Sequence, residues 1–216
     1  DALFLSLKAL DIGENDEVIT TPFTFIATIG AIVTAGAKPV FVDIKDDYNI
    51  DEKKIRFAIT KKTKAIMPVH WGGRPCELHK IKFIAKKYNL KVIQDSCHAI
   101  DAKLNNRHLI SYGDICTYSM HPLKNLNVWG DGGSIATNDD EIAKFLKSYR
   151  NHGMTDRDHN EMWGINSRMQ PFQAIVGAKV LDTVDHSNSI RIRNARLLDD
   201  GLKNLEGCIS IPDRHS

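Results

Sequence analysis

Residues 114–133 read DICTYSMHPLKNLNVWGDGG, and this stretch points to both a fold and a chemistry. Its first six residues have the apolar character of a buried strand. Lys124 lies in the segment just after that strand, five residues past Ser119, although most lysines are solvated surface charges. Gly130, Gly132 and Gly133 come next and predict a tight turn or a close backbone approach to a ligand. We therefore take Lys124 as a candidate for chemistry at its amine.

Two further residues extend this set. Asp95 closes the apolar segment KVIQD at 91–95, and Ser119 ends the strand that precedes Lys124. A lysine amine can form an imine with the aldehyde of pyridoxal phosphate (PLP), and a carboxylate can keep the pyridine nitrogen protonated so that the ring accepts electrons. The three residues together predict a PLP site. The alternatives are a solvated lysine, a helix N-cap at Asp95 and an ordinary strand-end serine.

Helical and strand-like segments alternate along the chain. We expect strands over 17–21, 39–43, 65–69, 91–94, 114–119 and 134–137, and helices over 2–10, 25–35, 51–59, 139–149, 171–181 and about 190–205. Repeated β–α units with apolar strands predict an α/β fold, with a mostly parallel (mixed) central sheet and helices on both faces. Ligands of such sheets lie beyond the carboxyl ends of the strands. His70, Asp95 and Ser119 all fall at or just past such ends.

Three local features refine these expectations. Pro75 is typical of the first turn of a helix, and we expect the helix after 69 to open there. Asn138 followed by Glu141 resembles a capping box for the helix at 139–149. Residues 153–169 lack periodicity and predict a long loop, which in a compact domain is often functional.

The composition is that of a globular protein, with 216 residues of which 42% are hydrophobic and 26% charged. A formal net charge of +2 gives no reason to expect nucleic acid or a membrane as a partner. The histidines show no metal-binding spacing, so we expect no metal. The four cysteines, Cys76, Cys97, Cys116 and Cys208, lack CxxC spacing. Cys97 and Cys116 fall in apolar segments and are typical of reduced core thiols, which predicts a reducing compartment, the cytoplasm.

The two ends suggest a fragment of a longer protein, because the chain begins inside an expected helix and stops without completing an element. We expect residues 1–185 to form a large domain whose N-terminal segment is missing. Residues 186–216 would then be a linking helix and the start of an incomplete C-terminal small domain.

Five motifs, in the same order along the chain as in a known family, carry a resemblance to that family. They are GENDEVITTPFTFIATIGAIVTAGAKPVFVDI (13–44), KAIMPVHWGGRPCEL (64–78), VIQDSCHA (92–99), YSMHPLKNLNVWGDGG (118–133) and GINSRMQPFQAIVGAKVL (164–181). The chain resembles the DegT/DnrJ/StrS family of PLP-dependent sugar aminotransferases, which have the aspartate-aminotransferase fold (fold type I). The resemblance implies the large, PLP-binding domain of that fold.

The resemblance also implies roles for the matching residues. Lys124 would bind the cofactor covalently and then move a proton as a neutral amine, and Asp95 would pair with the pyridinium nitrogen. His98 would contact the cofactor ring or its phenolic oxygen, and Ser119 would bind the phosphate. Phe25, in the TPFTF turn, would stack on the ring, and plain core packing is the alternative for it.

Asn166 would reach the phosphate from a partner subunit, which implies a homodimer with a shared active site. The implied reaction moves an amino group from an amino acid, by analogy glutamate, to a nucleotide-linked keto-sugar. The product would serve cell-surface polysaccharide or a secondary metabolite. Two alternatives remain: a non-catalytic or regulatory relative that binds a sugar nucleotide, and a PLP-dependent sugar dehydratase. Lysine at position 124, where some relatives have histidine and act as dehydratases, favours transamination.

The sequence departs from the family pattern at two positions near the aspartate motif. Gln94 stands where the family has glutamate, and Asp101 where it commonly has glycine. Neither change removes a residue with a proposed role, but Asp101 adds a charge near the strand that carries Asp95.

Overall fold

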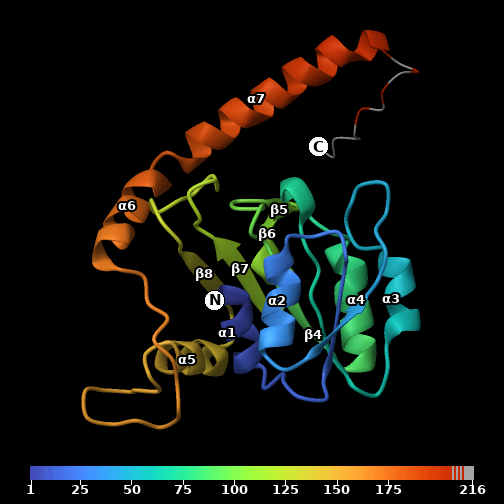
Figure 1. The fold of residues 1–216 in the computed structure, drawn as a ribbon. Coiled ribbons are helices and arrows are strands. Elements are labelled where there is room, and N and C mark those ends of the chain that lie inside the picture. Colours follow the sequence, from blue (N-terminus) through green and yellow to red (C-terminus); the bar gives the residue numbers. More distant parts are fainter. Residues whose placement is uncertain (206, 208, 210, 212–216) are drawn as a thin grey trace.

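A six-stranded sheet organises the chain in this computed structural model, which describes residues 1–205, 207, 209 and 211 (Figure 1). The strand order is β2-β1-β3-β4-β7-β8. The bounds are β1 (Glu17–Thr20), β2 (Lys38–Phe41), β3 (Thr63–Ile66), β4 (Lys91–Asp95), β7 (Ile115–Ser119) and β8 (Gly133–Thr137). All neighbouring pairs are parallel except β7 and β8, which are antiparallel. The predicted mostly parallel, mixed sheet is confirmed.

Helices cover both faces of this sheet, as predicted (Figure 1). Helices α1 (Ala2–Ala9), α2 (Ile26–Thr34) and α5 (Asp140–Tyr149) pack on one face, and α3 (Glu52–Ala58) and α4 (Leu78–Tyr88) pack on the other. Successive strand residues point to opposite faces, so each strand serves two cores. On β1, Val18 joins the core under α1 and α2, whereas Ile19 joins the core under α3 and α4.

Two helix starts differ from the expected ones. Helix α4 begins at Leu78 rather than in the turn that Pro75 opens. The chain before it is held against the sheet, because the Cys76 N–H donates to His70 Nδ1 at 3.0 Å and the Cys76 thiol donates to the Val69 carbonyl. Helix α5 is capped by Asp139 and not by Asn138, since Asp139 Oδ1 accepts from the N–H groups of Glu141 and Ile142.

A short hairpin was not predicted. It consists of β5 (Lys103–Leu104) and β6 (Arg107–His108), which pair in antiparallel fashion. Asn105 and Asn106 form its two-residue turn and both have positive φ, at 50° and 58°. Asparagine tolerates this left-handed backbone, so the Asn-Asn pair was the available signal in the sequence. Single 3₁₀ turns, η1 (Trp71–Gly73) and η2 (Leu109–Tyr112), also lie near the sheet.

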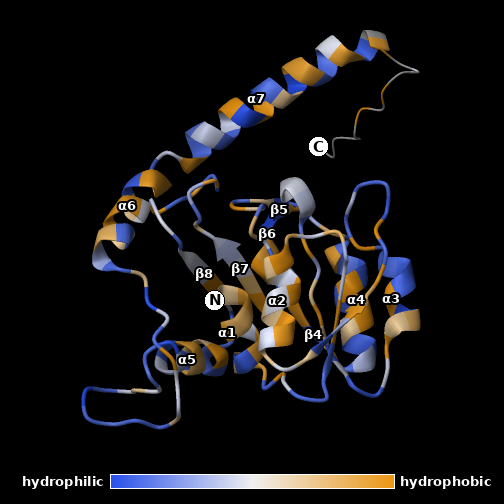
Figure 2. Cartoon of the chain, in the orientation of Figure 1, coloured by the Kyte–Doolittle hydropathy of each residue, from blue (hydrophilic) through white to orange (hydrophobic). Residues whose placement is uncertain are grey.

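The later chain is helical. Helix α6 (Pro171–Leu181) has the predicted bounds, and α7 (Val184–Leu202) begins six residues before the expected 190 and is followed by η3 (Lys203–Leu205). Helix α7 runs away from the sheet, and apolar and polar residues alternate along it (Figures 1 and 2). None of the helices in the described part of the chain combines the length and apolarity that crossing a bilayer requires. Cys208 lies outside the described residues.

Candidate active site

Asp95 is a buried carboxylate at the carboxyl end of β4, with only 4% of its surface exposed. Its Oδ2 accepts a hydrogen bond from Thr28 Oγ1 at 2.7 Å, and its Oδ1 accepts from the Cys97 N–H at 3.1 Å. Both donors are neutral, and Asp95 has no ion pair within the described residues. Buried charges in proteins are usually paired. This carboxylate is therefore suited to a cationic partner supplied by a ligand, such as a protonated ring nitrogen.

Lys124 lies in the turn that follows β7, where its backbone N–H donates to the His121 carbonyl at 2.8 Å. Its side chain is half-buried, and its amine makes no hydrogen bond or ion pair with any described residue. The charges of Lys124 and Asp95 both act on Cys97 and on His98. The structure therefore brings the predicted amine and carboxylate to one region without joining them in an ion pair.

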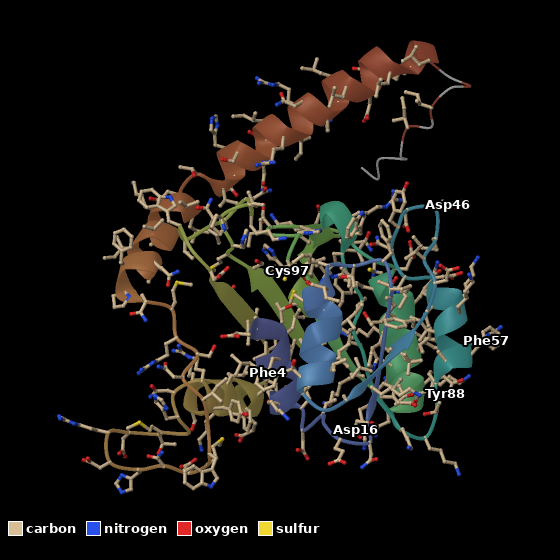
Figure 3. All side chains as sticks on the ribbon, in the orientation of Figure 1. Phe4, Asp16, Asp46, Phe57, Tyr88 and Cys97 are labelled. Atoms are coloured by element: carbon tan, nitrogen blue, oxygen red, sulfur yellow. The ribbon has the colours of Figure 1, made fainter. Side chains whose placement is uncertain are left out.

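This region lies at the end of the sheet that the sequence predicts. In Figure 3, Cys97, which follows β4, lies at the upper end of the sheet, whereas Asp16, which precedes β1, lies at the lower end. In a parallel sheet the upper end is then the carboxyl end of the strands, where ligands of α/β folds bind.

His98 is an exposed residue beside this pair, with its imidazole edge-on to the Trp71 ring at 5.4 Å. Partial burial of the ring and the positive charge of Lys124 lower the pKa of His98, while Asp95 acts in the opposite direction. A histidine with a lowered pKa is neutral at neutral pH and can donate or accept one hydrogen bond. His98 is thus able to contact an oxygen of a bound ring.

Cys97 belongs to the same region but is not reactive. Burial raises the pKa of its thiol, and the negative charge of Asp95 adds to this effect despite the opposing charge of Lys124. The thiolate is the nucleophilic form, so a raised pKa makes the group inert. Cys76, Cys97 and Cys116 are all free thiols, in agreement with the reduced thiols that the sequence predicts.

Ser119 is the last residue of β7 and pairs with Gly133 of β8. Its Oγ accepts from the His121 N–H at 3.3 Å. A Cβ placed on Gly133 would stand 3.5 Å from the Cβ of Ala2, the first residue of α1. The N-terminus of α1 and Ser119 therefore lie near each other. Helix N–H groups and a hydroxyl are suitable donors for a phosphate.

The glycines after Lys124 do not supply left-handed backbone for a tight turn. The left-handed backbone of this turn is at Trp129, with φ 57°, and not at Gly130, Gly132 or Gly133. A Cβ on Gly130 would stand 2.9 Å from Gln173 Nε2, and one on Gly132 would stand 2.7 Å from Val128 Cγ2. Gly130 and Gly132 therefore leave room for protein neighbours, and a close backbone approach to a ligand stays a prediction.

Of the two remaining predicted site residues, Phe25 lies near Asp95 and Asn166 lies in a separate loop. Phe25 caps the N-terminus of α2 and is 69% exposed, three residues before the Thr28 that contacts Asp95. Asn166 lies instead in the loop between α5 and α6, where it bridges Asn151 and accepts from Arg168 Nε at 2.9 Å. Phe25 is thus close along α2 to the Asp95 region, whereas the intrachain contacts of Asn166 are to its own loop and the end of α5.

His70, although it follows a strand end, is a structural residue. It is fully buried, its Nδ1 accepts from the Cys76 N–H at 3.0 Å, and its Nε2 lies 3.1 Å from Gln94 Oε1. Because Nδ1 accepts, Nε2 carries the proton and donates to Gln94. The expectation that His70 belongs to a ligand site with Asp95 and Ser119 is wrong, since the protein uses both ring nitrogens.

Sequence reasoning missed Thr28, the buried hydroxyl that donates to Asp95. It lies in the motif TPFTFIAT, and its polar side chain in an otherwise apolar first helical turn was the available signal. The structure also has a hollow of about 270 Å³ that Asn15, Lys38 and Lys62 help to line. It lies at the amino ends of β1 and β2, away from Asp95 and Lys124, and we assign it no role.

The chain is similar to known proteins over its whole length. The model of the DegT/DnrJ/EryC1/StrS aminotransferase family matches residues 1–216. A protein of Geobacillus stearothermophilus named pleiotropic regulatory protein is 43% identical over 210 residues, which are 95% of this chain and 56% of that protein. UDP-N-acetyl-3-dehydro-alpha-D-glucosamine 3-aminotransferase of Acidithiobacillus ferrooxidans is 46% identical over 177 residues, which are 82% of this chain and 48% of that enzyme.

The fold is shared with solved structures. The crystal structure of NtdA from Bacillus subtilis with bound cofactor PMP superposes with a TM-score of 0.92 at 36% identity, covering 98% of this chain and 49% of NtdA. The predicted α/β fold of PLP-dependent aminotransferases is confirmed. The chain spans about half the length of the curated relatives it matches.

Proposed function

This chain belongs to the DegT/DnrJ/EryC1/StrS aminotransferase family, and we propose that it is the cofactor-binding part of a PLP-dependent sugar aminotransferase. The enzyme would move an amino group from an amino acid, with glutamate as the expected donor, to the keto group of a nucleotide-linked sugar. The aminated sugar would enter cell-surface polysaccharide or a secondary metabolite. The named aminotransferase of Acidithiobacillus ferrooxidans supports the substrate class.

One observation carries the proposal. A half-buried amine, Lys124, and a buried carboxylate, Asp95, act on the same neighbours yet neither has an ionic partner in the described chain. PLP suits both groups, because its aldehyde reacts with an amine and its ring nitrogen is a base. PMP, the aminated form of this cofactor, is bound in NtdA. When bound, PLP carries the amino group and withdraws electrons from the substrate carbon.

The chain's own residues would divide the remaining work. Asp95 would hold a proton at the ring nitrogen, since a buried carboxylate stabilises a cation beside it. Lys124 Nζ, as the neutral amine, would take a proton from the substrate carbon and deliver it to the cofactor carbon C4′, and it would run the reverse transfer when the keto-sugar is aminated. His98, neutral through its lowered pKa, would contact a ring oxygen.

The other binding residues would set the position of the ring. Ser119 would donate to the phosphate together with the N-terminus of α1, which lies beside Gly133. Phe25 would lie against the ring face, and its exposure of 69% leaves it free to do so.

Asn166 would act across a dimer interface. Its contacts within the chain are to its own loop and to Asn151 at the end of α5, so it is available to bind the phosphate of a second subunit. We therefore propose a homodimer in which each active site includes this residue of the partner. A dimer-disrupting change would then weaken PLP binding, whereas a monomer that binds PLP as tightly as the wild type would contradict the shared site.

We propose that residues 1–185 are the large domain and that residues 186–216 are a linking helix and the start of a small domain. The division at 185/186 falls in the first turn of α7, which runs away from the sheet (Figure 1). We also propose a cytoplasmic location, which the free thiols of Cys76, Cys97 and Cys116 support.

The test uses the complete protein with added PLP. Borohydride reduction should fix the cofactor to Lys124, and peptide mass spectrometry would locate it there. Incubation with glutamate and a panel of nucleotide-linked keto-sugars should then give an aminated sugar identified by mass. Cofactor fixed to another lysine would show that the site is wrong, and fixation at Lys124 without any aminated product would reject the sugar substrate.

A further inference from the structure

Two threonines of α2 and its preceding turn form a chain of hydroxyl groups that ends on Asp95. Thr28 is 1% exposed, and its Oγ1 lies 2.7 Å from Asp95 Oδ2. Thr24 Oγ1 lies 2.8 Å from Thr28 Oγ1. Both contacts have the short separation of good O–H···O hydrogen bonds. The carboxylate is thus connected through side chains to the turn that carries Phe25.

The direction of this chain follows from the chemistry of its groups. An ionised carboxylate only accepts hydrogen bonds, so Thr28 donates to Asp95. A hydroxyl has a single proton, and that of Thr28 is used. The proton between the two threonines must therefore come from Thr24. Each hydroxyl dipole points toward Asp95, and aligned hydrogen bonds of this kind reinforce each other.

The two oxygens of Asp95 are held from different sides. Thr28, on α2, holds Oδ2, and the Cys97 N–H, in the loop after β4, holds Oδ1. One donor on each oxygen fixes the rotation of the carboxylate about its last bond. The backbone ties the turn to the same helix, because the Thr28 N–H donates to the Phe25 carbonyl at 3.1 Å.

We propose that Thr28, supported by Thr24, is the positioning residue for Asp95 and orients its carboxylate toward the ring nitrogen of the cofactor. This inference rests on the proposed function. Thr28 would touch neither cofactor nor substrate and would act only through Asp95. The same hydroxyls would keep the turn with Phe25 in register with Asp95.

The test measures PLP binding to the complete protein. Thr28→Val keeps the shape of the side chain and removes the donor. Because hydrogen bonds to charged groups are among the stronger ones, we expect PLP affinity to fall roughly 10- to 100-fold. Thr24→Val should cost less, about threefold to tenfold, since it acts one bond further away. Thr28→Ser keeps the hydroxyl and should restore affinity to within about threefold of the wild type.

A matched control lies at the other end of the sheet. Thr60 Oγ1 donates to the Glu17 carboxylate, so Thr60→Val removes the same kind of bond away from the site. It should leave PLP affinity unchanged. As a second readout, the pH at which the absorbance of bound cofactor changes should shift in Thr28→Val and not in Thr60→Val, because only the former alters the partner of the ring nitrogen.

The possible failures are distinguishable. If Thr28→Val binds PLP with wild-type affinity and an unchanged absorbance profile, the positioning role is wrong while the PLP site stands. If the wild type does not bind PLP at Lys124, the proposed function fails and this inference with it. Should Thr28→Val not fold, Thr24→Val decides the question, because Thr24 is only half-buried and its replacement is easier to tolerate. Wild-type PLP affinity in Thr24→Val would then contradict the proposed chain of hydroxyl groups.

Discussion

Gln94 and Asp95 are neighbours on β4, both are buried, and the structure treats them in opposite ways. Gln94 accepts from His70 Nε2 and donates to the Leu109 carbonyl at 2.9 Å, on the face covered by α4. Asp95 points to the other face and to Thr28 of α2. The Gln94 side is a neutral network in which each donor meets an acceptor, whereas the Asp95 side keeps a charge with no counter-ion in the described chain.

The difference indicates where the fold serves stability and where it serves function. A closed neutral network satisfies every buried polar group that it contains. A buried carboxylate with neutral donors alone is costly to the folded state and is retained where a ligand provides the compensating charge. The end of β4 thus separates two faces. We call the side of Gln94, with His70, the structural face, and the side of Asp95, with Thr28 and Lys124, the chemical face. Changes on the two faces should have different consequences.

The largest effect on the chemical face should come from Lys124→Ala. Removing the amine removes both the covalent attachment and the proton transfer, so we expect turnover to fall by about 10⁴-fold or more. Melting temperature without cofactor should stay near that of the wild type, because this amine makes no intrachain bond. Lys64→Ala, which changes an exposed lysine of β3, is the control and should keep full activity. Turnover at the wild-type rate after Lys124→Ala would contradict the assignment of the chemistry to this amine.

Asp95→Asn should come next. It removes the charge that holds the proton at the ring nitrogen, so we expect activity to fall on the order of 10²–10³-fold. Stability without cofactor should change by less than about 1 kcal/mol, because a neutral amide avoids the cost of burying an unpaired charge. Urea unfolding and steady-state rates measure the two effects. Asp114→Asn, at the opposite end of β7 where Asp114 accepts from the Val92 N–H at 2.8 Å, is the control and should leave activity intact. A large loss of stability with little loss of rate in Asp95→Asn would reverse the assignment of the two faces.

Much of both faces was predictable from the sequence, for physical reasons that differ. Apolar strands and strand-end polar residues predicted the sheet and the positions of Asp95, Ser119 and Lys124, because parallel strands bring their carboxyl ends together. Periodicity does not report which face a strand-end residue points to when the whole strand is buried. For that reason His70 was grouped with Asp95 although it serves the other side.

Local hydrogen bonding explains the remaining misses. Thr28 was overlooked because its partner is 67 residues away, and a helix-start threonine ordinarily caps its own helix. The start of α4 was misplaced because His70 captures the Cys76 N–H and holds the chain extended past Pro75. Both outcomes depend on contacts between distant segments, which a local pattern does not contain.

On the structural face, His70 should make the protein sensitive to acid. Burial lowers the pKa of His70 to about 4, against the opposing effects of the Gln94 hydrogen bond and the Asp95 charge. Between pH 6.5 and 4, the unfolded chain therefore binds a proton at this histidine that the folded chain does not. The free energy of unfolding should therefore decrease as the pH is lowered through this window, by up to about 3 kcal/mol near pH 4. Urea unfolding of the cofactor-free protein at several pH values, compared with His70→Gln, isolates this slope. An identical slope in the variant would mean that His70 is not held neutral.

The smallest effect should come from Gln94→Glu, which places a charge on the structural face. The new carboxylate can accept from His70 Nε2, but its other oxygen would face the Leu109 carbonyl that now accepts from Gln94 Nε2. Two acceptors in contact should cost about 1–3 kcal/mol at pH 8. The cost should diminish as pH falls through the pKa of the new carboxyl group, because its protonated form can donate to Leu109 again.

The matched control for Gln94→Glu is Gln173→Glu. Gln173 Nε2 also donates to a backbone carbonyl, that of Asp131 at 2.8 Å, but Gln173 is only half-buried and this bond is exposed to solvent. There water can solvate the new charge, so stability should change by less than about 0.5 kcal/mol. PLP affinity should stay within about twofold in Gln94→Glu, since its side chain faces away from Thr28 and Asp95. A loss of PLP affinity comparable to that of Asp95→Asn would show that the two faces of β4 are coupled, and that the neutral network is part of the site rather than its support.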